Sequence, residues 1–175
     1  MRWVALLRAV NLGGANKVPM AELRARLGDA GYANVRTYIA SGNILLDGPG
    51  SASALSAELE RLIADAFGVT TKVVLRRPEA LAATVAAHPF GSDTSETHVA
   101  FLAARPTRPA VARLEAAAPR DDLAVFAGAE LYLRLPRGVH GSRLSSARIE
   151  KLLDVPATLR NWRTVVALAD LAAEA

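Results

Sequence analysis

The sequence has no cysteine, which excludes disulfide bonds and thiolate metal sites and fits a reducing compartment. Aromatic residues make up only 5% of the chain. The three histidines, His88, His98 and His140, form no pair at helical metal-ligand spacing, and no HExxH motif is present. No hydrophobic run is long enough to span a membrane. The sequence therefore predicts no metal site, no cofactor and no membrane association.

The composition is that of an ordinary globular protein, with 51% hydrophobic and 22% charged residues in 175. This length suits one domain or two small subdomains with a real core. Arg8 and Asn11 interrupt the apolar N-terminal run, which also lacks a signal-peptide cleavage site. Together with the missing cysteines, this favours a cytoplasmic location.

The formal net charge is +4, and the excess lies mainly in the second half. Residues 97–163 carry eleven basic and six acidic side chains, against ten and nine in residues 1–96. Two interpretations are open, namely a solvated arginine-rich surface and a surface that meets an anionic partner such as nucleic acid.

Hydrophobic periodicity in the first half predicts the order strand, helix, strand, strand, helix, strand. This is the order of a split βαβ, or ferredoxin-like, unit over residues 1–77. Ser41-Gly42 lies between two strand-like runs, which indicates a hairpin. The elements are expected at residues 3–10, 20–31, 34–40, 43–47, 55–67 and 71–75.

A bridging helix and loop over residues 78–97 precede a related second half over 98–175. That half predicts strand, helix, hairpin and helix, but its closing strand is not visible in the pattern. Residues 158–173 instead read as a loop leading into a C-terminal helix. The predicted fold class is α+β, with two ferredoxin-like halves, the second incomplete, and a C-terminal helix. The second-half elements are expected at residues 98–103, 109–118, 123–126, 131–135 and 143–154.

Several stretches resemble the uncharacterised bacterial family called domain of unknown function 1697. The matching segments are LLRAVNLGGANKVPMAELR (6–24), VRTYIASGNILL (35–46), TLRNWRTVVAL (158–168) and, more weakly, LPRGVHGSRL (135–144). This chain differs from the usual family pattern at Ala9, Leu159 and Arg143, where glycine, threonine and lysine are common. The resemblance implies an α+β fold of ferredoxin-like halves, and it implies no activity.

The stretch after the first strand is the first candidate ligand site. Arg8 and Asn11 follow the strand, Gly13 and Gly14 permit a close approach of the backbone, and Lys17 precedes a helix N-terminus. These features suit an anion. The spacing matches neither a Walker A motif nor a dinucleotide fingerprint, and the alternative is a tight structural loop whose asparagines bond their own backbone.

The predicted hairpin supplies a second group of polar side chains. Arg36 and Tyr38 share one face of a strand, and Ser41 and Asn43 sit at the turn. They could converge on a polar ligand, or they could belong to an ordinary hairpin with a solvated face.

The third group precedes the C-terminal helix. Arg160 and Trp162 could stack and pair with a ligand. The alternative is a core tryptophan, with Asn161 as the N-cap of the helix.

Three classes of function follow from these residues. The first is binding of an anionic small molecule or nucleotide in a cleft between the halves. The second, which the lack of aromatics on the central strands disfavours, is nucleic-acid binding by the basic second half. The third is an enzyme with a non-standard site, with Tyr38 or His88 as acid or base, and no catalytic residue is assigned.

Overall fold

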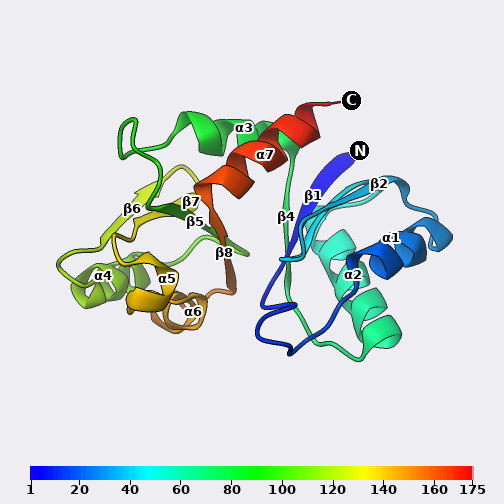
Figure 1. Cartoon of the computed structure of the whole chain (residues 1–175), viewed down its shortest axis with the longest axis horizontal. Helices are drawn as coiled ribbons and strands as arrows, with labels where there is room; N and C mark the ends of the chain where they lie inside the picture. Colours follow the sequence, from blue (N-terminus) through cyan, green and yellow to red (C-terminus); the bar gives the residue numbers. More distant parts are fainter. Residues whose placement is uncertain (175) are drawn as a thin grey trace. The chain divides into compact units, whose positions relative to one another are not determined.

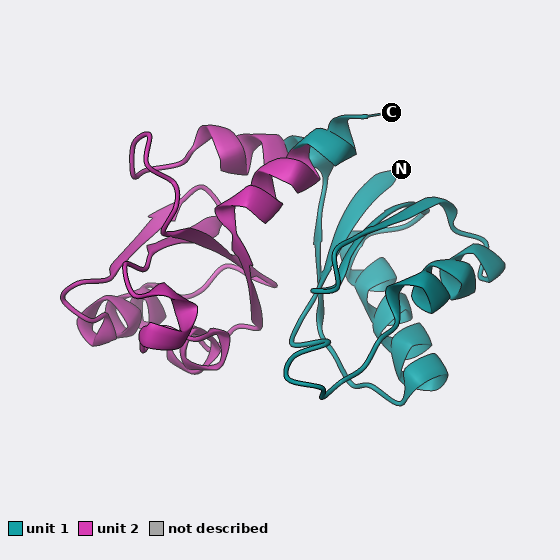
Figure 2. Cartoon of the chain, viewed as in Figure 1, with its two compact units in different colours: residues 1–80, 170–175 teal, residues 81–169 magenta. Residues whose placement is uncertain are grey.

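The computed structural model describes residues 1–174 and contains two four-stranded antiparallel sheets (Figure 1). The chain divides into two units, which Figure 2 colours separately. The first unit comprises Met1–Ala80 and Asp170–Ala175, and the second comprises Leu81–Ala169. Both units are α+β, as predicted.

The first unit has the element order expected for a split βαβ unit. Its sheet has the strand order β2-β3-β1-β4, with antiparallel pairing throughout. The elements are β1 (Arg2–Leu7), α1 (Met20–Asp29), β2 (Ala33–Tyr38), β3 (Asn43–Asp47), α2 (Ala52–Phe67) and β4 (Val73–Arg76). The bridging helix α3 (Pro78–Ala86) follows.

Both helices of the first unit cover the same face of its sheet (Figure 1). The apolar stripe of α2, made of Leu55, Leu59 and Ile63, is buried against alternate residues of β1 and β3. Burying each such side chain contributes about 2 kcal/mol. The helix ends at Gly68, whose φ of 66° is the left-handed C-cap conformation that glycine adopts readily.

The second unit repeats this arrangement, with strand order β6-β7-β5-β8. Its elements are β5 (Thr97–Leu102), α4 (Arg108–Ala117), β6 (Leu123–Ala127), β7 (Glu130–Arg134), α5 (Gly138–Gly141), α6 (Ser146–Leu153), β8 (Ala157–Asn161) and the greater part of α7 (Trp162–Ala173), whose last residues belong to the first unit. The prediction of an incomplete second half was wrong in this respect, because β8 closes the sheet by pairing with β5. The expected loop before the C-terminal helix is therefore a strand.

The two faces of the second sheet differ in character. Helices α4 and α6 lie together on an apolar face, where Leu114 and Ile149 pack against Ala100 of β5. On the other face, Val99 lies opposite both Tyr132 of β7 and Arg160 of β8. All three of these side chains are buried, so this face combines apolar and polar groups.

Several element boundaries differ from the sequence prediction. Strand β1 ends at Leu7 rather than at residue 10, because the chain turns at Ala9, which has a φ of 52°. Helix α6 begins at Ser146, where the Ser145 hydroxyl accepts a hydrogen bond from the Arg148 amide. The short helix α5 was not anticipated. Within residues 1–174, no helix has the length and apolarity needed to cross a membrane.

Candidate functional site

The β1–α1 loop (residues 8–19) contains a miniature hairpin. The Asn11 amide donates to the Asn16 carbonyl at 3.0 Å, and the Ala15 amide donates to the Leu12 carbonyl at 2.9 Å. The two central residues of the turn are glycines with φ of 55° and 83° (Gly13 and Gly14), as a type I′ turn requires. The paired glycines therefore form a tight turn whose tip is exposed.

The Asn11 side chain ties this loop to two other segments. Its Oδ1 accepts from the Val18 amide at 2.8 Å, and its Nδ2 donates to the Val18 carbonyl at 2.9 Å. The same Nδ2 donates to the Ala40 carbonyl at 2.7 Å, while Asn16 Nδ2 donates to the Ala9 carbonyl at 3.0 Å. These bonds support the structural interpretation of both asparagines, and they hold the loop beside the β2–β3 turn.

The β2–β3 turn (residues 39–42) is organised by a buried amide. Asn43 is fully buried, and its Nδ2 donates to the Tyr38 carbonyl at 2.9 Å and to the Ser41 hydroxyl at 3.0 Å. Tyr38 pairs with Asn43 across the hairpin, so all three residues belong to one local structure. Asn43 thus acts inside the turn, while Ser41 is half-buried at its surface.

Gly42 lies where the turn approaches β1 most closely. Its carbonyl accepts a hydrogen bond from the Leu7 amide at 2.8 Å, and its φ is 83°. A Cβ atom at Gly42 would lie 2.6 Å from Val10 Cγ2 and 2.7 Å from Leu7 Cβ. Both the backbone conformation and the available space therefore require glycine.

We call the β1–α1 loop and residues 39–43 together the loop edge of the first unit. The Arg8 main chain is fixed there, because its amide donates to the Lys72 carbonyl and its carbonyl accepts from the Thr71 hydroxyl. Lys17 is exposed and forms no ion pair with any residue in the described part of the chain. Of the predicted cations, Lys17 is thus the most accessible at this edge.

Arg36 is engaged elsewhere in the first unit. Its Nη1 lies 2.9 Å from Glu174 Oε2, and about half of each side chain is exposed. Arg36 and Tyr38 share a sheet face, as predicted, with Arg36 opposite Leu45 of β3. An anion that recruited Arg36 would compete with Glu174.

The third predicted group lies in the second unit. Arg160 is on strand β8 and is only 6% exposed, and its guanidinium donates to the Thr158 hydroxyl at 2.7 Å. Burial lowers the pKa of Arg160 to about 10. Asn161 Oδ1 accepts from the Thr164 amide at 2.9 Å, so Asn161 caps α7 as the structural alternative predicted.

Trp162 packs against His88, and the two residues belong to an aromatic cluster that was not predicted from the sequence. The two ring centroids are 4.3 Å apart, and His88 Nε2 lies 3.1 Å from the Thr97 hydroxyl. Phe90 and Tyr132 meet the same imidazole edge-on, at 5.7 and 6.5 Å. Phe90, which follows His88-Pro89 directly, is the only member of this cluster that the sequence places beside His88. Tyr132 joins the cluster through the register of the second sheet.

Burial sets the protonation of this cluster. It lowers the pKa of His88, and it raises the pKa of Tyr132 to about 12, with the charge of Glu130 acting in the same direction. The Tyr132 hydroxyl donates to the Thr84 carbonyl at 2.7 Å. At neutral pH His88 is therefore an uncharged imidazole beside a protonated phenol.

The fluorescence of Trp162 should titrate with His88, because a protonated imidazole quenches an indole in contact with it. The midpoint should lie below the ordinary histidine value near 6.5. The unfolded chain then binds more protons than the folded one just below that value, so stability should fall as the pH drops through this region. His88→Gln should abolish the fluorescence step, and a midpoint above 6.5 would contradict the assignment.

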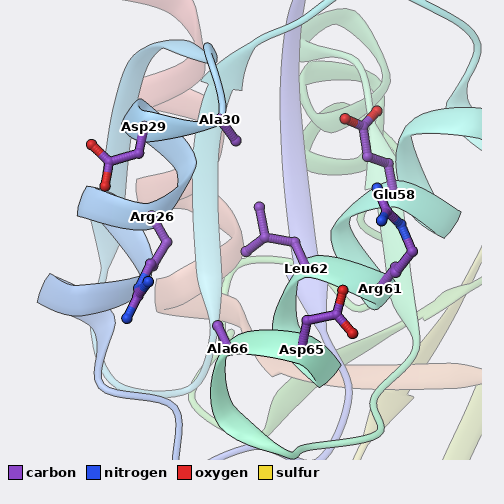
Figure 3. Close-up of a pocket in the computed structure, with 8 residues that line it drawn as sticks. All are labelled: Arg26, Asp29, Ala30, Glu58, Arg61, Leu62, Asp65 and Ala66. Atoms are coloured by element: carbon purple, nitrogen blue, oxygen red, sulfur yellow. The ribbon is translucent and has the colours of Figure 1, made fainter.

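An open groove of about 450 Å³ lies between α1 and α2 (Figure 3). Leu62 lies between the two helices, and charged side chains surround it. The groove is lined by two arginines, three carboxylates and three apolar residues, namely Arg26, Arg61, Asp29, Glu58, Asp65, Ala30, Leu62 and Ala66. This mixture of charges does not favour an anion. Among the described residues, no group of three or more His, Asp or Glu side chains could hold a metal ion.

Most of the predicted site residues fall into two places, and the other two, Arg36 and Tyr38, lie on β2. The loop edge brings together the loop residues and the β2–β3 turn, whereas Arg160, Asn161 and Trp162 lie at the β8–α7 junction of the second unit. The loop edge carries the greater number of predicted site residues.

Known proteins with similarity to this chain match residues in both units. The family model described as "Protein of unknown function (DUF1697)" matches residues 1–132. The solved structure of the conserved bacterial protein SP0830 from Streptococcus pneumoniae is 25% identical, with a TM-score of 0.75 over 98% of each chain. No curated protein gives a significant match.

Proposed function

The chain belongs to the DUF1697 family of proteins of unknown function, and we propose that it binds an anionic small molecule or nucleotide at the loop edge. The observation that carries the proposal is the 2.7 Å hydrogen bond from Asn11 Nδ2 to the Ala40 carbonyl. This bond holds the β1–α1 loop and the β2–β3 turn side by side. A ligand at the loop edge would therefore meet a preformed surface rather than two independent loops.

The charge of the loop edge supports an anionic ligand. Arg8 and Lys17 are its ionisable side chains, and neither residues 8–19 nor residues 39–43 contain an aspartate or glutamate. The α1–α2 groove, in contrast, mixes two arginines with three carboxylates. An anion gains Coulomb energy from an exposed cation such as Lys17, whereas mixed charges largely cancel.

Neutral donors at the same edge suit phosphate oxygens. Helix α1 begins there, and none of its first amides is bonded to a side chain of its N-cap residue, Pro19. The first amides of a helix point outward and carry partial positive charge, which favours anions. Ser41 lies at the surface of the neighbouring turn and is a hydroxyl of the kind that bonds phosphate. Glu22, in the first turn of α1, reduces this attraction.

A thermal-shift titration of the full chain with pyrophosphate and with ATP tests the proposal. Both probes should raise the melting temperature in a concentration-dependent manner, because a ligand that binds the folded state stabilises it. Lys17→Glu should weaken the apparent affinity about tenfold or more, which corresponds to about 1.4 kcal/mol.

Lys151→Glu is the matched control, because Lys151 is an exposed lysine on α6 of the second unit. It makes the same change of net charge away from the loop edge and should leave the shift in place. Equal weakening by both variants would show that net charge alone drives binding. That result, or the absence of any shift with the wild-type chain, would overturn the proposal.

A further inference from the structure

The two sheets have four edge strands, and one of them differs from the rest. Strands β2, β4 and β8 each carry an arginine, at Arg36, Arg76 and Arg160. The sequence of β6 is LAVFA, with no charged residue and no proline. Soluble proteins commonly protect sheet edges with charges, proline or bulges, because an open edge can pair with another strand. Strand β6 has none of these protections.

The outward side chains of β6 are also apolar. Leu123 is 45% exposed and Val125 is 36% exposed, and both project from the same face of the strand. Only five large hydrophobic side chains of the described residues are exposed, and these two are separated by a single residue. The edge thus combines unprotected backbone with uncovered apolar surface.

The hairpin geometry fixes which backbone groups face outward. The two-residue turn at Gly128-Ala129 joins Ala127 to Glu130, and Gly128 has a φ of 63°. A turn of this length is closed by a hydrogen-bonded pair, and such pairs alternate along an antiparallel ladder. Val125 and Leu123 therefore bond to β7, while the amides and carbonyls of Ala124 and Phe126 point away from it.

We propose that β6 pairs with β6 of a second copy of this chain, antiparallel and about a two-fold axis at Val125. In this register Ala124 lies opposite Phe126 of the second copy, and the two residues exchange both of their backbone hydrogen bonds. Symmetry repeats this pair, so every outward group of β6 acquires a partner. Leu123 covers the small Ala127 of the second copy, and Val125 packs against Val125 of the second copy.

A second copy fits this edge because the strand is complementary to itself in that register. The corresponding strand of the first unit, β2, is unsuited to the same pairing. Its ladder with β3 shifts register between Ala33 and Arg36, and Arg36 is held by Glu174. Pairing through β6 alone would join the second-unit sheets of two chains into one continuous sheet. Five residues bury little area, so the dimer should be weak and concentration-dependent.

Sedimentation equilibrium of the full chain over a wide concentration range tests the pairing. The wild-type chain should associate reversibly to a dimer. Val125→Lys and Val125→Glu should each weaken association at least about tenfold, because like charges would then face each other across the two-fold axis. An equimolar mixture of the two variants should dimerise again, which only a contact of residue 125 with its own counterpart explains.

Two further variants separate edge pairing from general effects of charge and folding. Ala124→Pro removes an outward amide while sparing the bonds to β7, and it should also weaken the dimer. Ala116→Lys places a charge on the exposed side of α4 and should leave the dimer intact. Circular dichroism should show folded protein in each case. A wild-type chain that stays monomeric, a dimer that survives Val125→Lys, or a variant mixture that does not associate would overturn the proposal.

Discussion

Replacing Gly42 with alanine should lower the free energy of unfolding by about 3 kcal/mol or more. The left-handed backbone at this position costs an L-residue about 1 kcal/mol. The added Cβ would also lie 2.7 Å from Leu7 Cβ, which belongs to β1 and cannot rotate away. Overpacking of this kind typically costs about 1 to 3 kcal/mol more. Urea denaturation of the variant and the wild-type chain measures the difference.

Gly14 offers a matched control for this substitution. It has the same φ of 83°, and a Cβ there would meet no heavy atom within 4 Å. Gly14→Ala should therefore cost only the backbone term of about 1 kcal/mol. Equal destabilisation by the two variants would show that close packing against β1 contributes nothing, contrary to the geometry described for the β2–β3 turn.

Replacing Asn11 with glycine should lower the free energy of unfolding by about 2 to 4 kcal/mol. The substitution removes three side-chain hydrogen bonds, two with Val18 and one with Ala40, each worth about 1 kcal/mol net. Glycine tolerates the φ of 55° at this position, so the substitution adds no backbone strain to the loss of the hydrogen bonds. Because the bond to Ala40 holds the loop edge together, the affinity for pyrophosphate should fall as well.

Asn16→Gly is the corresponding control within the same loop. Asn16 also has a positive φ, 49°, but its side chain donates only to the Ala9 carbonyl. This variant should lose about 1 kcal/mol. A larger loss of unfolding free energy for Asn16→Gly than for Asn11→Gly would mean that the hydrogen bond between the loop and the turn is not the main support of the loop edge.

Most elements of the fold could be predicted from local sequence patterns, because the apolar periodicity of each element agrees with the residues that begin or end it. The helix expected over residues 55–67 is α2, and the hairpin expected between residues 123–126 and 131–135 is formed by β6 and β7. Strand β8 escaped prediction because its five residues, ATLRN, do not alternate clearly between apolar and polar. Its pairing with β5 and the burial of Arg160 are tertiary effects that no local pattern encodes.

The candidate site was predictable in its residues but not in their roles. Gly13 and Gly14 were predicted to permit a close approach of the backbone to a ligand, and in the structure they form a type I′ turn with an exposed tip. The sequence left Asn11 open between ligand and structural roles, and the bond to Ala40, 29 residues away, supports the structural one. The cluster around His88 and Tyr132 depends on the register of the second sheet, so spacing along the chain carried no sign of it.

Binding of an anion at the loop edge can be measured residue by residue in an NMR titration of the ¹⁵N-labelled chain with pyrophosphate. We expect saturable shifts of the backbone amides of Gly13, Gly14, Ser41 and Gly42, with the amides of the α1–α2 groove unaffected. Shifts that centre on Arg61 and its neighbours in that groove, or no saturable shift at the loop edge, would contradict it.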